Sequence, residues 1–170
     1  LIKERGLDTL QNCPRSPQAV LSHLYSVTEV MKLPYQQTNT KYDIIVKARF
    51  DLGRINRNTS GPGLGNPFAV QCINFQTDIE NGKLYNANWN HFNMGPADMW
   101  FYGSPNVMVE FTSLFSFLDE QMKIDSEFHK FATQIEGNSG DLSNAIAFYK
   151  WWMMKTDLWD NRINLDTTWE

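Results

Sequence analysis

The chain has 170 residues, of which 42% are hydrophobic and 14% aromatic, so it is long enough for one domain with a substantial core. Its 15 basic and 19 acidic residues give a net charge of -4, which excludes the broad positive surface typical of nucleic-acid-binding proteins. Cys13 and Cys72 show no zinc-ligand or disulfide spacing, and no apolar run approaches the roughly 20 residues that span a bilayer. We therefore expect a single domain over residues 1–170, located in the cytoplasm, with no transmembrane segment.

The first predicted element is a helix. Ser16 followed by Pro17 is a helix-start signal, and apolar residues then recur at helical spacing as far as Met31. This helix is expected to end near Pro34. Because the chain begins with Leu1 so close to the helix, we also expect that an N-terminal piece is missing.

The segment over residues 42–51 is predicted to be a strand, because it is short and rich in β-branched residues between two stretches that disfavour a helix. Side chains alternate between the two faces of a strand. One face then carries Ile44, Val46, Ala48 and Phe50, and the other carries Ile45, Lys47, Arg49 and Asp51. Three charged residues therefore share one face toward the carboxyl end of the strand.

Five further elements are expected along the rest of the chain. Residues 68–75 and 99–102 are predicted strands, and residues 83–92 are predicted as a strand or a loop. Ser104 followed by Pro105 starts a second helix, whose apolar stripe consists of Met108, Phe111, Phe115, Leu118 and Met122. A third helix is predicted over residues 142–155, with Asp141 before it as a candidate cap. This order of elements predicts an α/β domain.

Asp51 stands where ligands bind in open α/β sheets, beyond the carboxyl end of a strand. Its carboxylate is the kind of hard oxygen ligand that Mg²⁺ or Mn²⁺ prefers, and such a cation neutralises a diphosphate leaving group. Arg49 and Lys47, on the same face, suit the oxygens of a phosphate. The alternative is that Arg49 and Asp51 pair with each other or with neighbouring loops.

A second group of candidate residues lies near Asp98, which stands just before an aromatic strand and a capped helix. This carboxylate is a candidate general base, or an acceptor for a substrate hydroxyl, and the alternative is that it caps a local turn. Shortly before it, His91 and Asn93 lie in a stretch of amides and aromatic rings. Sugars bind to such groups because their hydroxyls need oriented partners and their C–H faces stack on rings, although an ordinary half-buried loop has the same composition.

Two blocks of sequence resemble bacterial and phage glycosyltransferases of the GT-A-like, nucleotide-diphospho-sugar transferase type. The first block is Tyr42-Asp43-Ile44-Ile45-Val46-x-x-Arg49-x-Asp51-Leu52, preceded by the helix that begins near Ser16. The second block is Asp98-x-Trp100-Phe101-x-Gly103-Ser104, with Met108 following. The resemblance covers roughly residues 16 to 122.

The resemblance implies a partial GT-A-like fold, a mixed sheet flanked by helices that forms the C-terminal, acceptor-side part of the enzyme. The activity it implies is transfer of a sugar from a nucleotide-sugar donor to a glycan hydroxyl. Asp51 then falls where GT-A enzymes carry the last acid of their DxD metal-binding motif. Arg49 stands where the first acid of that motif would be, which leaves dependence on Mg²⁺ or Mn²⁺ open. Asp98 falls on the acceptor side, and Trp100, His91 and Asn93 are the candidate acceptor-binding residues near it. The alternatives are a non-catalytic carbohydrate-binding or structural remnant of such an enzyme, and a different nucleotide-using transferase.

Overall fold

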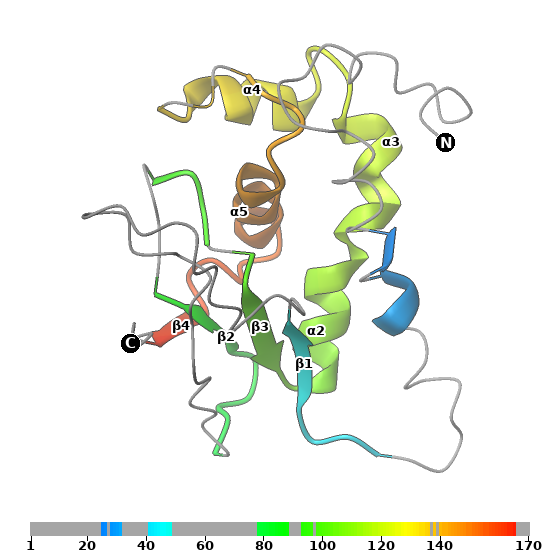
Figure 1. Cartoon of the computed structure of the whole chain (residues 1–170), viewed down its shortest axis with the longest axis vertical. Helices are drawn as coiled ribbons and strands as arrows, with labels where there is room; N and C mark the ends of the chain where they lie inside the picture. The colour runs from blue at the N-terminus through cyan, green and yellow to red at the C-terminus, as the bar shows by residue number, and fades with distance from the viewer. Residues whose placement is uncertain are drawn as a thin grey trace, which may run out of the picture.

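The computed structural model of the protein describes residues 25–26, 28–31, 41–48, 78–88, 93–96, 98–136, 138 and 140–165. Within these residues a sheet of four strands is covered by helices on one face (Figure 1). The strands lie in the order β1-β3-β2-β4 and comprise β1 (Ile45–Ala48), β2 (Leu84–Ala87), β3 (Trp100–Gly103) and β4 (Arg162–Leu165). β3 is antiparallel to both β1 and β2, whereas β4 runs parallel to β2, so the sheet is mixed. The expected α/β class is confirmed.

The expected N-terminal helix is described only in part. Residues 28–31 are helical, and Met31 is buried. The hydroxyl of Thr28 donates a hydrogen bond of 2.8 Å to the carbonyl of Thr112, and the ring of Tyr25 lies 5.3 Å from that of Phe115. This segment therefore packs on the helical layer that follows the sheet. The strand expected over residues 68–75 lies outside the described residues.

The predicted second helix begins as expected but is not continuous. α2 (Pro105–Thr112) leads into a 3-10 helix, η3 (Ser113–Phe117), and then into α3 (Leu118–Gln121). The side chain of Thr112 donates to the carbonyl of Met108, and that of Ser113 donates to the carbonyl of Glu110. Such hydroxyl contacts with the preceding turn bend helices, which is consistent with the tighter winding that starts here. All members of the predicted apolar stripe are nevertheless buried: Met108, Phe111, Phe115, Leu118 and Met122.

The predicted third helix is α5 (Ala145–Lys155), and its cap differs from the expected one. The side chain of Asn144 accepts hydrogen bonds from the amides of Ile146 and Ala147 and so caps the helix. Asp141 instead accepts from the amide and hydroxyl of Ser143, at 2.8 and 2.5 Å, within the turn before it. Because Asp and Asn both cap helices and both stabilise turns, the sequence did not distinguish these two roles.

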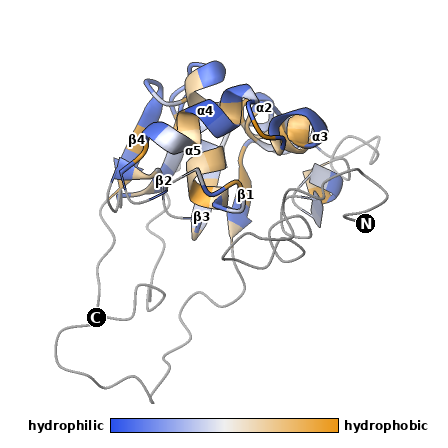
Figure 2. Cartoon of the chain, turned by 90° about the horizontal axis from the view of Figure 1, so that it is seen from above, coloured by the Kyte–Doolittle hydropathy of each residue, from blue (hydrophilic) through white to orange (hydrophobic). Residues whose placement is uncertain are grey.

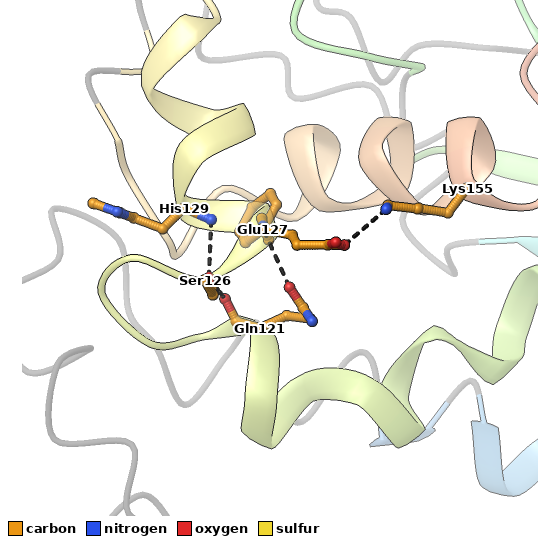
Figure 3. Close-up of polar contacts among 6 residues, drawn as sticks. Gln121, Ser126, Glu127, His129 and Lys155 are labelled. Carbon is orange, nitrogen blue, oxygen red and sulfur yellow. Dashed lines mark hydrogen bonds and ion pairs between the residues drawn. The ribbon is translucent and has the colours of Figure 1, made fainter.

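The sequence analysis did not predict two elements that the structure contains, α4 (Glu127–Gln134) and β4. Ser126 caps α4 by accepting a hydrogen bond of 3.0 Å from the amide of His129 (Figure 3). Ser126 also donates to the carbonyl of Gln121, whose side-chain oxygen accepts from the amide of Phe128. These contacts join the end of α3 to the start of α4. An ion pair of 2.7 Å between Glu127 and Lys155 then links α4 to α5.

The two faces of the sheet bury different residues. On the helix-covered face, Phe101 lies between Phe111 of α2 and Tyr149 of α5, with ring centroids 4.5 and 5.5 Å away. On the other face, Tyr85 and Tyr102 stack at 4.7 Å, and Trp100 lies beside them. α5 is the central helix of the layer, since all of its residues from Ala147 to Met153 are buried. In Figure 2, α4 is drawn mostly in the blue of hydrophilic residues, whereas α5 is drawn mostly in the paler colours and orange of less hydrophilic and hydrophobic residues.

Among the helices that the structure describes, none has both the length and the apolar character needed to cross a bilayer.

Two serines that precede eight-residue helices provide a matched test of capping. Ser126 accepts the hydrogen bond described above. The hydroxyl of Ser104, before α2, is buried and makes no cap bond or other hydrogen bond among the described residues. We expect Ser126→Ala to lower the free energy of unfolding by about 1 kcal/mol, the usual effect of losing an N-cap. Ser104→Ala should be neutral or slightly stabilising, because it removes an unsatisfied buried hydroxyl. Urea unfolding of both variants measures the difference, and equal losses would contradict the assignment.

Candidate functional site

The two blocks that carry the glycosyltransferase resemblance lie side by side in the sheet. β1 comes from the first block and β3 from the second, and they pair from Ile45 opposite Gly103 to Ala48 opposite Trp100. Lys47 of β1 donates a hydrogen bond of 2.8 Å from Nζ to the carbonyl of Asp98. Asp98 therefore lies close to the carboxyl end of β1, where the sequence analysis expected a site.

Lys47 belongs to the helix-covered side of the sheet and is only 9% exposed. Its Nζ lies 5.2 Å from the centroid of the Phe101 ring and 5.6 Å from that of Tyr149, within the range of cation–π interactions. By contrast, Val46 on the opposite face is 42% exposed. Lys47 is thus more buried than its apolar neighbour Val46. Its ammonium holds the backbone at Asp98. Binding of a donor phosphate by Lys47 stays a prediction.

Three of the candidate residues lie outside the described part of the chain. They are Arg49 and Asp51, assigned to phosphate and cation, and His91, assigned to the acceptor. Their roles stay predictions. Among the described residues, no group of three His, Cys, Asp or Glu side chains is placed to hold a metal ion.

Trp100 and Asn93, the two described candidates for acceptor binding, are both engaged with the protein. Trp100 is 2% exposed and stacks on Tyr102 at 5.8 Å, and its buried indole N–H has no hydrogen-bond partner within the described part of the chain. Asn93 has a φ of 55° and offers its backbone and side-chain oxygens to the same ammonium, that of Lys150, at 2.7 and 2.8 Å. The structure therefore shows these residues in packing and loop positioning, and sugar binding by either one stays a prediction.

Asn93, Gly95 and Asp98, which precede β3, are held against α5 and β1. Lys150 binds Asn93 and Lys47 binds Asp98, as described above. Between them Gly95, with a φ of 148°, runs so close to α5 that an added Cβ would lie 2.4 Å from the carbonyl oxygen of Ile146. A side chain at this position would collide with backbone, so glycine is required there. Contacts with α5 and β1 thus position Asn93, Gly95 and Asp98.

Lys150 is the centre of a second charged cluster, which the sequence analysis did not find. It projects from α5, is 8% exposed, and its Nζ lies 5.0 Å from the centroid of the Trp159 ring. Arg162 of β4 stacks on the same ring, with Cζ 3.5 Å from the centroid, and donates to the carbonyl of Trp159. The signal available in the sequence was a single lysine within the otherwise apolar run of residues 145–154.

Burial and charge both act on these two cations. Burial lowers the pKa of Lys150 below its usual 10.5, and the neighbouring charge of Arg162 lowers it further. Burial also lowers the pKa of Arg162, against the opposite effect of Asp160. Each shift reflects the cost of keeping a cation away from water.

Comparison of the chain with protein-family models, with curated proteins and with solved structures gave no significant match.

The lowered pKa of Lys150 predicts how stability depends on pH. Between its folded and unfolded pKa values, the unfolded chain binds more protons at this site, so stability rises with pH in that interval. We therefore expect the free energy of unfolding of the wild type to increase relative to that of Lys150→Met as the pH is raised toward 10.5. Urea unfolding at a series of pH values tests this, with Lys155→Met as the control for loss of an exposed lysine from the same helix. A constant difference between wild type and Lys150→Met would contradict the expectation.

Proposed function

We propose that the chain is the acceptor-side part of a GT-A-like glycosyltransferase, which transfers a sugar from a nucleotide-sugar donor to a glycan hydroxyl. The observation that carries this proposal is the pairing of β1 with β3, because it brings together the two sequence blocks of the resemblance. The hydrogen bond from Lys47 to the carbonyl of Asp98 adds a direct contact between these blocks. A mixed sheet flanked by helices is compatible with the GT-A-like type.

In this proposal Asp98 is the general base. Its carboxylate accepts the proton of the acceptor hydroxyl while the new glycosidic bond forms and the bond between sugar and diphosphate breaks. The side chain is half-buried, and the segment that carries it is fixed at Asn93 and Asp98 by two lysines. Such rigid support favours catalysis, because a base must lie within hydrogen-bond reach of its proton.

The donor side of the proposal rests on the sequence. Arg49 and Lys47 bind diphosphate oxygens, and Asp51 holds Mg²⁺ or Mn²⁺ where the reaction uses one. Such a cation, when bound, neutralises the diphosphate leaving group. On the acceptor side, Asn93, His91 and Trp100 contribute to the sugar-binding surface. The cytoplasmic location also belongs to the proposal, since it was inferred from the cysteine content.

The role of Asp98 is tested by Asp98→Asn in a transfer assay with nucleotide-sugar and glycan. The amide keeps the shape, and the contact with Lys47 is retained because it uses the backbone carbonyl. Loss of a general base lowers the rate by about 10²–10⁴-fold, and we expect a fall in kcat of this size with little change in KM for the acceptor.

The matched control for this experiment is Asp125→Asn in the turn before α4. Asp125 is exposed and has a φ of 64°, which asparagine also tolerates. The Asp125→Asn substitution should leave kcat unchanged. Wild-type turnover in Asp98→Asn would remove Asp98 from the mechanism, and glycan binding by a wild type without turnover would favour the carbohydrate-binding alternative.

The proposed acceptor-side assignment leads to a separate expectation for the 170-residue chain. The sequence shows no strand and helix N-terminus before Ser16 to hold a nucleotide base and ribose. We therefore expect this chain to fold but to bind nucleotide-sugars weakly or not at all. Calorimetric titration with common nucleotide-sugars and Mn²⁺ measures this, and micromolar affinity would show that the donor site is complete within these residues.

A further inference from the structure

We propose that Lys150 of α5 and Arg162 of β4, which both contact the ring of Trp159, form a binding site for a small anionic group, a phosphate or a carboxylate. This anion site is distinct from the proposed base, Asp98. It does not depend on glycosyl transfer, so the two proposals can succeed or fail separately.

The first argument is the environment of Lys150. Lys150 is 8% exposed, yet the hydrogen-bond partners of its ammonium are the two neutral oxygens of Asn93. Within the described residues no carboxylate lies within ion-pair distance of it. A buried cation is costly unless a negative charge compensates it, and neutral partners with one indole ring offset only part of that cost. Asp160 supplies a negative charge near Arg162, but among the described residues Lys150 has no carboxylate partner of its own. An added anion would compensate the charge of Lys150.

The second argument is the position of Arg162. Two cations share the ring of Trp159, with Lys150 Nζ at 5.0 Å and Arg162 Cζ at 3.5 Å from its centroid. The like charges of the two residues repel each other, and the charge of Arg162 lowers the pKa of Lys150. An anion bound between them turns this repulsion into two attractions.

The third argument is the number of donors. A guanidinium has five N–H groups and an ammonium has three. In the described structure Arg162 uses one group for the carbonyl of Trp159, and Lys150 donates to two oxygens of Asn93. Donors therefore remain on both cations. Phosphate and carboxylate oxygens are the acceptors that match them, since a guanidinium binds either group through two parallel hydrogen bonds.

The anion site also connects to the segment that carries Asp98. Lys150 holds Asn93, at the start of this segment, by both oxygens. An anion that draws the ammonium toward Arg162 competes with these contacts. Occupancy of the anion site is thereby coupled to the placement of Asn93.

The experiment measures binding of sodium phosphate, sodium pyrophosphate and sodium acetate to the whole chain at constant ionic strength. NMR of the lysine Nζ groups follows the titration, with thermal unfolding as a second readout. We expect phosphate or pyrophosphate to bind, to raise the pKa of Lys150 and to raise the Tm. A stronger response to acetate than to phosphate would identify a carboxylate as the preferred group.

Variants separate this site from general charge effects. Lys150→Met and Arg162→Gln should each weaken phosphate binding by at least about tenfold, the effect of losing one charge-assisted hydrogen bond. Lys155→Met removes the same charge from an exposed position on α5 and should bind as the wild type does. Lys150→Arg keeps the charge and should retain binding, which provides a result even where Lys150→Met fails to fold. Absence of binding in the wild type, or an equal loss in Lys155→Met, would overturn the proposal.

Discussion

The burial of α5 is the constraint on which the other elements depend. Because its residues from Ala147 to Met153 are all buried, α5 must be covered on every side over its middle turns. The sheet covers one side through Phe101, and α4 covers another through Phe128, whose ring lies 4.8 Å from that of Phe148. The side chain of Trp152 also donates to the carbonyl of Glu110 in α2. A single helix thus defines the positions of the sheet and of the helices around it.

The same constraint explains why two lysines position the segment before β3. A lysine that points into a layer made mainly of aromatic rings needs oxygen acceptors, and the nearest backbone supplies them. Lys47 donates a hydrogen bond to the carbonyl of Asp98, and Lys150 donates to both oxygens of Asn93. Each acceptor is thereby held by one ammonium, so that both Asn93 and Asp98 are anchored. Charge placed inside the core therefore fixes a loop rather than stabilising the core itself.

The sequence predicted those elements whose signals are local. The Ser104-Pro105 start, the apolar stripe after it and the strand at residue 45 are all present, because capping and periodicity are properties of adjacent residues. α4 and β4 were missed for different reasons. α4 has only two buried residues, Phe128 and Ala132, so its periodic signal is short. β4 owes its strand conformation to pairing with β2, a partner far away in the sequence.

The candidate site shows the same division between local and non-local information. Alternation placed Lys47 on the charged face of its strand, but it did not show that this face is the one covered by helices. That outcome depends on which face α5 packs against, and tertiary packing decides it. Lys150 is a clearer example, because a lysine within an apolar helix breaks the binary pattern. Proteins tolerate such local conflicts mainly where a buried charge has a use. A break in the pattern is therefore a better guide to a site than the surrounding regularity, and in this chain it leads to the cluster of Lys150, Trp159 and Arg162.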